Sequence, residues 1–90
     1  MNSINSRSPT VQAIDDILGE LDQAQKKFLP FHSAHEGYAV ILEELDELKA
    51  HVWQKQSERD YEAMRHEAIQ VAAMALRFIG DVCDGMGERR

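Results

Sequence analysis

The chain has 90 residues, enough for one domain with a modest core, and a domain of this size often gains stability by self-association. Its 16 acidic and 10 basic residues leave a net charge of −6, which argues against polymeric nucleic acid or an anionic membrane as a partner. The apolar runs are short for a membrane span, the N-terminus lacks a secretory signal, and the single cysteine cannot form an internal disulfide. We therefore expect a cytoplasmic homo-oligomer.

The apolar residues follow helical spacing, and no segment shows the alternation that is typical of β-strands. A first helix is predicted over residues 9–28, where Ser8 resembles an N-cap residue and Pro9 takes the first helical position. Pro30 then breaks this helix, because proline restricts the residue before it and has no backbone N–H to donate.

A second helix is predicted to begin near His35 or Glu36 and to end near Gln56. Ser57, with Asp60 three positions later, resembles a capping box from which a third helix would start. This third helix is expected to weaken and end at its glycines, Gly80, Gly85 and Gly87.

The predicted fold class is therefore all-α, with three helices. The second and third helices should form an antiparallel hairpin, because the loop between them is short. We expect a disordered N-terminus over residues 1–8, one helical domain over residues 9–84 and a flexible C-terminus over residues 85–90.

Four carboxylates fall within residues 43–47 of the second predicted helix. Like charges three or four positions apart on a helix repel by about 0.2–0.5 kcal/mol per pair, so the run is costly unless a cation lies nearby. Winding the helix at about 100° per residue puts Glu44 and Glu47 beside its apolar stripe. Glu67 and Gln70 hold nearly the same positions on the third helix, so the hairpin could bring all four side chains together.

Three carboxylates and an amide make an all-oxygen site, which suits Mg²⁺ or Mn²⁺ rather than zinc. A carboxylate-bound Mg²⁺ keeps open positions for water and phosphate oxygens, so a nucleoside polyphosphate is the natural substrate class. A solvated acidic surface is the alternative interpretation, because exposed helices often carry two acids at this spacing.

Glu44-x-x-Glu47 on one helix and Glu67-x-x-Gln70 on the next resemble the ExxE and ExxD motifs of the MazG-like family of all-α nucleoside triphosphate pyrophosphohydrolases. The resemblance covers roughly residues 35–83 and departs at Gln70, where the family has Asp. It implies Mg²⁺ bound by Glu44, Glu47, Glu67 and Gln70. It also implies a homo-dimer or homo-tetramer whose helices form a four-helix bundle.

The implied reaction is hydrolysis of the α–β phosphate linkage of a nucleoside triphosphate, which releases a monophosphate and pyrophosphate and serves nucleotide-pool house-cleaning. Glu43 or a neighbouring acid would orient the attacking water. Because the amide of Gln70 carries no charge, a second hypothesis stays open: a non-catalytic helical oligomerisation or interaction protein with a degenerate metal site.

Two further residues near these motifs have alternative interpretations. Arg77 either meets a substrate phosphate or a partner's acid, or it forms a structural ion pair, which is the interpretation we favour. His66, next to Glu67, is interpreted as an exposed helix residue rather than a ligand.

Overall fold

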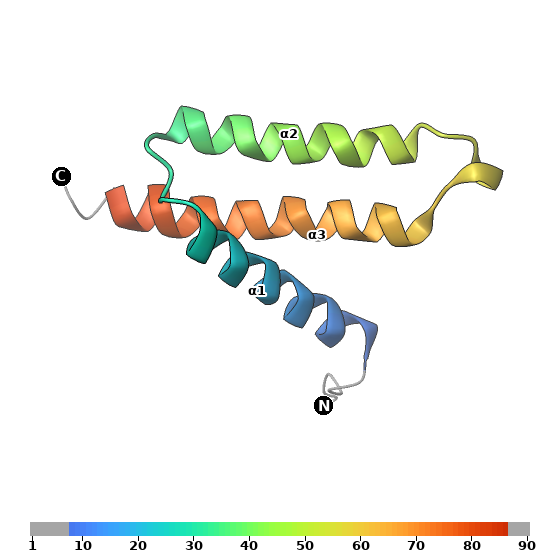
Figure 1. Ribbon diagram of the computed structural model, residues 1–90, viewed down its shortest axis with the longest axis horizontal. Coiled ribbons are helices and arrows are strands. Elements are labelled where there is room, and N and C mark those ends of the chain that lie inside the picture. Colours follow the sequence, from blue (N-terminus) through green and yellow to red (C-terminus); the bar gives the residue numbers. More distant parts are fainter. Residues whose placement is uncertain (1–7, 87–90) are drawn as a thin grey trace.

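The computed structural model describes residues 8–86 and is all-α over this range, which confirms the predicted fold class (Figure 1). No strand occurs in the described residues, and none of their helices is long and apolar enough to cross a membrane. Residues 1–7 and 87–90 lie outside the described range. They make up most of the N-terminus predicted to be disordered and of the C-terminus predicted to be flexible. The elements are α1 (Pro9–Lys27), α2 (Ala34–Val52), the 3₁₀-helix η1 (Gln56–Glu58), α3 (Tyr61–Phe78) and the π-helix η2 (Ile79–Met86).

Helix α1 begins as predicted. The Ser8 hydroxyl accepts a hydrogen bond from the backbone N–H of Val11 at 3.2 Å, and Pro9 opens the first turn. The helix ends at Lys27, where the N–H of Phe28 still donates to the carbonyl of Ala24 at 2.9 Å. The predicted range is therefore right to within one residue.

Helix α2 begins one residue before its predicted start, because Ser33 caps it by accepting a hydrogen bond from the N–H of Glu36 at 3.0 Å. The predicted end near Gln56 is wrong, since the helix ends at Val52. Arg59 Nη2 donates to the carbonyl of Val52 at 2.9 Å and so satisfies a terminal acceptor of the helix.

The predicted start of the third helix at Ser57 is also wrong. Ser57 lies in η1, and Asp60 caps α3 instead by accepting a hydrogen bond from the N–H of Ala63 at 3.0 Å. At the other end, the described chain continues from α3 as the π-helix η2, which runs from Ile79 to Met86. The carboxylate of Asp81 anchors this segment, because it accepts a hydrogen bond from the N–H of Phe31 at 3.1 Å.

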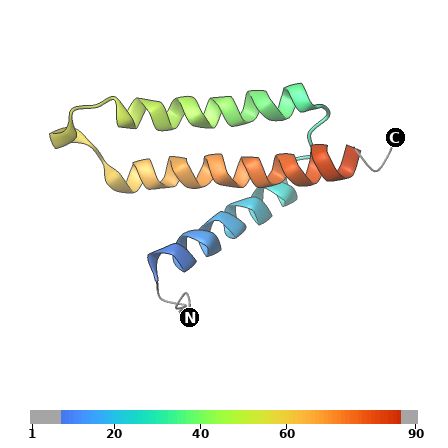
Figure 2. The ribbon, with the colours of Figure 1, turned by 180° about the vertical axis from the view of Figure 1, so that it is seen from behind.

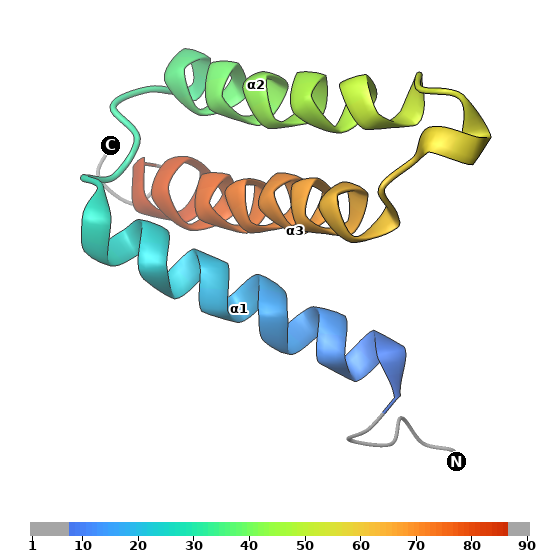
Figure 3. The ribbon, with the colours of Figure 1, turned by 45° about the vertical axis from the view of Figure 1, so that its right-hand side comes forward.

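The helices lie in one layer with α3 in the middle. Helices α2 and α3 run antiparallel, and α1 runs obliquely along the other side of α3 (Figures 2 and 3). The small core forms where the C-terminal half of α1 and the N-terminal half of α2 meet α3. Its members are Ala24, Phe31, Ala73 and Met74, with Ile17, Leu21, Val40, Ile41, Phe78 and Val82 packed around them.

Gly37 sets the distance between α2 and the end of α3. A Cβ atom at this position would lie 2.6 Å from Cδ2 of Phe78 and 3.1 Å from Cδ2 of Phe31. Real Cβ atoms do not approach other atoms to 2.6 Å, so the two rings can pack against α2 only because residue 37 has no side chain. The same contact fixes the antiparallel register of the hairpin.

Candidate metal centre

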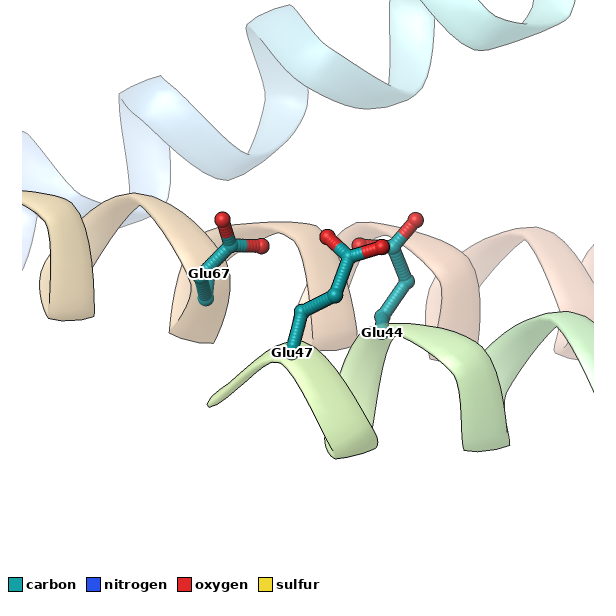
Figure 4. Close-up of side chains that lie close together, drawn as sticks. All are labelled: Glu44, Glu47 and Glu67. Atoms are coloured by element: carbon teal, nitrogen blue, oxygen red, sulfur yellow. The ribbon is translucent and has the colours of Figure 1, made fainter. Parts of the chain in front are cut away.

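Three of the four predicted ligands lie together. Glu44 and Glu47 extend from α2 and Glu67 extends from α3, with their carboxyl groups side by side (Figure 4). One carboxylate oxygen of each residue lies within 4.8 Å of the chosen oxygen of the others. A single cation could therefore contact all three side chains.

The cluster follows from the helical hairpin. Glu44 and Glu47 are three residues apart, so they share one side of α2, and the antiparallel neighbour α3 presents Glu67 opposite them. Glu44 and Glu67 are half-buried, whereas Glu47 is exposed. The site therefore lies at the edge of the helix interface, where it is open to ligands from the solvent.

The pKa of Glu44 is raised above its ordinary value of 4.5, and partial burial of its carboxyl group is the largest cause. The negative charges of Glu47, Glu67 and Glu43 add to the shift. His66, although exposed, lies near enough to act in the opposite direction. Both main causes disfavour a negative charge at Glu44, and a bound cation would relieve them.

The pKa of Glu47 is raised for a different main reason: its carboxyl group shares a hydrogen bond with that of Glu67. Such a bond needs a proton, because two ionised carboxylates only accept. The charge of Glu67, a small effect of burial and the charge of Glu43 act in the same direction. The carboxyl groups of Glu44 and Glu47 therefore hold protons more tightly than isolated ones.

Gln70, the fourth predicted ligand, makes a different contact. Its amide Nε2 donates a hydrogen bond to Oε1 of Glu20 on α1 at 2.6 Å. Sequence reasoning did not single out Glu20. The available signal was its place beside Ile17, Leu21 and Ala24 on the face of α1 that packs against the core, where an acid is unexpected.

A pocket of about 630 Å³ adjoins the carboxylates. Helix α3 forms its floor, α1 and α2 form its two walls, and the loop between α1 and α2 lines its far end. Glu44 lines both the pocket and the carboxylate cluster, so the two features are continuous. The lining residues that matter most for charge are Glu20, Lys27, Glu36, Glu43, Glu44 and Arg77.

Glu43, the predicted catalytic residue, is exposed and lines this pocket beside Glu44. It does not belong to the close cluster of three carboxylates, although its charge reaches both Glu44 and Glu47. Asp46, the remaining acid of the run, is exposed and lies outside both the cluster and the pocket lining. The acidic run is thus divided among three different surroundings.

Arg77 forms the structural ion pair that we favoured. Its side chain is buried, with Nε 3.6 Å from the Asp81 carboxylate. Nη2 donates to the carbonyl of Leu29 at 2.8 Å, and the guanidinium lies 4.0 Å from the ring centroid of Phe31. Arg77 and Asp81 together fix the loop that lines the far end of the pocket.

Comparisons of the chain with protein-family models, with curated proteins and with solved structures found no match, so the MazG-like resemblance is carried by the motif residues alone.

Proposed function

We propose that this protein is a Mg²⁺-dependent nucleoside triphosphate pyrophosphohydrolase, with Mn²⁺ as an alternative cation, that acts in nucleotide-pool house-cleaning. The observation that carries the proposal is the convergence of Glu44, Glu47 and Glu67 within 4.8 Å at the edge of a pocket. The pocket, at about 630 Å³, falls within the range of ordinary small-molecule sites.

The donor set fits a hard divalent cation. All three groups are carboxylates, which Mg²⁺ and Mn²⁺ prefer, and they come from one side, which leaves positions for water and phosphate oxygens. The raised pKa values of Glu44 and Glu47 indicate mutual repulsion that a cation would offset.

The proposed reaction is attack of water on the α–β phosphate linkage, with release of a nucleoside monophosphate and pyrophosphate. When bound, the cation supplies charge neutralisation for the phosphate oxygens and lowers the pKa of water. Glu44, Glu47 and Glu67 would hold the cation. Glu43 lines the pocket beside them and would accept the hydrogen bond that orients the attacking water.

Release of pyrophosphate tests the proposal. The purified chain is incubated with a panel of canonical and modified nucleoside triphosphates and Mg²⁺ or Mn²⁺, and the products are separated by ion exchange. We expect monophosphate and pyrophosphate from at least one member, and loss of both products in Glu44→Ala. Products at the level of Glu44→Ala across the whole panel would contradict the proposal, whereas a diphosphate and inorganic phosphate would point to cleavage of the other linkage.

Gln70 favours a second candidate, a non-catalytic helical interaction protein. The site has an amide where the MazG-like pattern has a fourth acid, and that amide is bonded to Glu20. This candidate predicts that the melting temperature is indifferent to Mg²⁺, because only a ligand that binds the folded state raises it. A Mg²⁺-dependent rise that disappears in Glu47→Ala would contradict it.

We further propose that the active form is a homo-dimer or homo-tetramer in which the α2–α3 hairpins of two copies form a four-helix bundle. Tyr38, Leu42 and Leu45 of α2 are 40–63% exposed. Winding at about 100° per residue puts them between about 100° and 180° away from Glu44 and Glu47. An apolar surface that faces away from the carboxylates would let two copies associate while both pockets stay open.

A further inference from the structure

Among the described residues that line the pocket, Glu20 and Gln70 form the only hydrogen bond between a side chain of α1 and one of α3. It joins residues 50 positions apart in the chain, at 2.6 Å, and both are half-buried. Both also line the pocket together with Glu44. The bond therefore crosses the pocket beside the proposed cation site.

The chemistry of the two groups determines which atom of Gln70 faces Glu20. An ionised carboxylate has no hydrogen to donate, so only the NH₂ of the amide can bond to it. The amide oxygen is then the atom that Gln70 keeps for another partner. Oxygen is the only atom of an amide that ligates Mg²⁺ or Mn²⁺, so the bond to Glu20 uses the nitrogen and leaves the ligating atom of Gln70 without that partner.

Glu20 itself is not one of the three carboxylates whose oxygens lie within 4.8 Å of one another. Glu20 can therefore act on the cation through its hydrogen bond to Gln70 or through its charge at longer range, and the experiment below separates the two. Side chains that orient a ligand in this way commonly affect metal affinity by about 10-fold to 100-fold.

We propose that Glu20 is a positioning residue of the site: its hydrogen bond across the pocket holds the Gln70 amide with its oxygen available to the cation, so that Gln70 serves where the related pattern has an acid. This inference rests on the proposed function and adds to it a residue from a third helix. Glu20 and Gln70 are then a matched pair. An Asp at position 70 alone would face the carboxylate of Glu20.

Titration with Mn²⁺ alone, followed by the melting temperature of the full chain, tests the pairing. Glu20→Ala should weaken the apparent Mn²⁺ affinity by about 10-fold. Glu20→Gln keeps an acceptor oxygen for the Gln70 NH₂ and should stay within about threefold of the unaltered chain. Asp15→Ala, which removes an exposed charge from the same helix, is the matched control and should titrate like the unaltered chain.

The reciprocal exchange gives a second readout. Gln70→Asp should lower the melting temperature measured without cation, because it brings two carboxylates together. Adding Glu20→Gln to Gln70→Asp should restore that temperature and the Mn²⁺ response, since the amide introduced on α1 could then donate to the carboxylate introduced on α3. Circular dichroism confirms that each variant is helical before titration.

The outcomes separate this inference from the function on which it rests. A Mn²⁺ response that is lost in Glu47→Ala but unchanged in Glu20→Ala overturns the role of Glu20 and leaves the cation site standing. Equal losses in Glu20→Ala and Glu20→Gln overturn positioning, because only the charge would then matter. The absence of any Mn²⁺ response in the unaltered chain overturns the cation site and the inference together.

Discussion

Each of the three clustered carboxylates has a distinct environment. Glu44 is partly buried beside like charges, Glu47 is exposed and hydrogen-bonded to Glu67, and Glu67 reaches the pair from another helix. These side chains lie at the edge of the helix interface, with Glu44 and Glu67 half-buried and Glu47 exposed. Their convergence is costly for an isolated chain and favourable for one that binds a cation.

The pH dependence of stability follows from these shifts. The pKa values of Glu44 and Glu47 lie above the ordinary 4.5, so the folded chain binds protons more tightly than the unfolded chain. Their contribution to the free energy of unfolding is fully present at pH values below their ordinary pKa of 4.5. It is lost as the pH rises through the higher pKa values that the two groups have in the folded chain. In EDTA, the melting temperature should therefore rise as the pH falls from about 7 towards this range.

Calorimetry of the unaltered chain and Glu47→Gln checks this expectation. The variant cannot ionise at position 47, so its melting temperature should change less with pH. Asp16, whose pKa is lowered mainly by its hydrogen bond to Arg65, acts in the opposite direction, but only below its ordinary 3.8. Identical pH profiles for the two proteins would argue against repulsion within the cluster.

The carboxylates of the hairpin could be predicted from sequence because helical winding and antiparallel packing are enough to bring Glu44, Glu47 and Glu67 to one edge. The hydrogen bond between Gln70 and Glu20 could not be predicted in this way. It depends on how α1 is placed and rotated against α3, and neither the spacing within the hairpin nor the loop containing Pro30 determines that placement.

At the scale of elements, some helix boundaries likewise follow from the local sequence, whereas others involve contacts with distant residues. The starts of α1 and α2 follow from local capping by Ser8 and Ser33. The end of α2 depends instead on Arg59, seven residues from the carbonyl of Val52, and the persistence of η2 depends on the contact of Asp81 with the distant Phe31. Contacts between elements thus accompany two of the boundaries that sequence patterns missed, whereas the start of α3 follows from local capping by Asp60.

Two glycines provide a matched test of the contact between α2 and α3. Gly37→Ala should lower the free energy of unfolding by about 1–3 kcal/mol, because the new Cβ would collide with the rings of Phe78 and Phe31. Gly19→Ala, in the open part of α1, has no atom within 4 Å of the new Cβ and should raise that free energy by up to about 1 kcal/mol.

Urea unfolding at one protein concentration, followed by circular dichroism, measures both variants. The free energy of unfolding should fall for Gly37→Ala and rise for Gly19→Ala, although both variants add the same methyl group. A stabilising Gly37→Ala would mean that Phe78 moves aside freely, and the close approach of α2 to α3 would then not fix the register of the hairpin.

At the scale of the whole molecule, the layer of helices leaves many apolar side chains uncovered. Ile14, Leu18, Tyr38, Leu42, Leu45, Tyr61, Leu76 and Ile79 are each at least 39% exposed. The buried apolar residues of the described chain are only Ala24, Phe31, Ile69, Ala73 and Met74. A second copy over this surface would add the burial that the single chain lacks.

Sedimentation equilibrium tests this association. The unaltered chain should sediment as a dimer or tetramer, and Leu45→Glu should shift it towards monomer, because the new charge would be buried between copies. Leu29→Glu introduces the same change at an exposed loop residue and should leave the assembly intact. A folded monomer in the unaltered chain would contradict the proposed four-helix bundle.

Binding of a divalent cation by Glu44, Glu47 and Glu67 is the step on which the proposed function depends, and electron paramagnetic resonance of Mn²⁺ measures it directly. The signal of free Mn²⁺ should fall on addition of the protein, with saturation at one ion per chain, and Glu47→Gln should bind more weakly by about 10-fold or more. A free-ion signal that equals the total Mn²⁺ added, in the unaltered chain at neutral pH, would contradict the metal centre and the hydrolase built upon it.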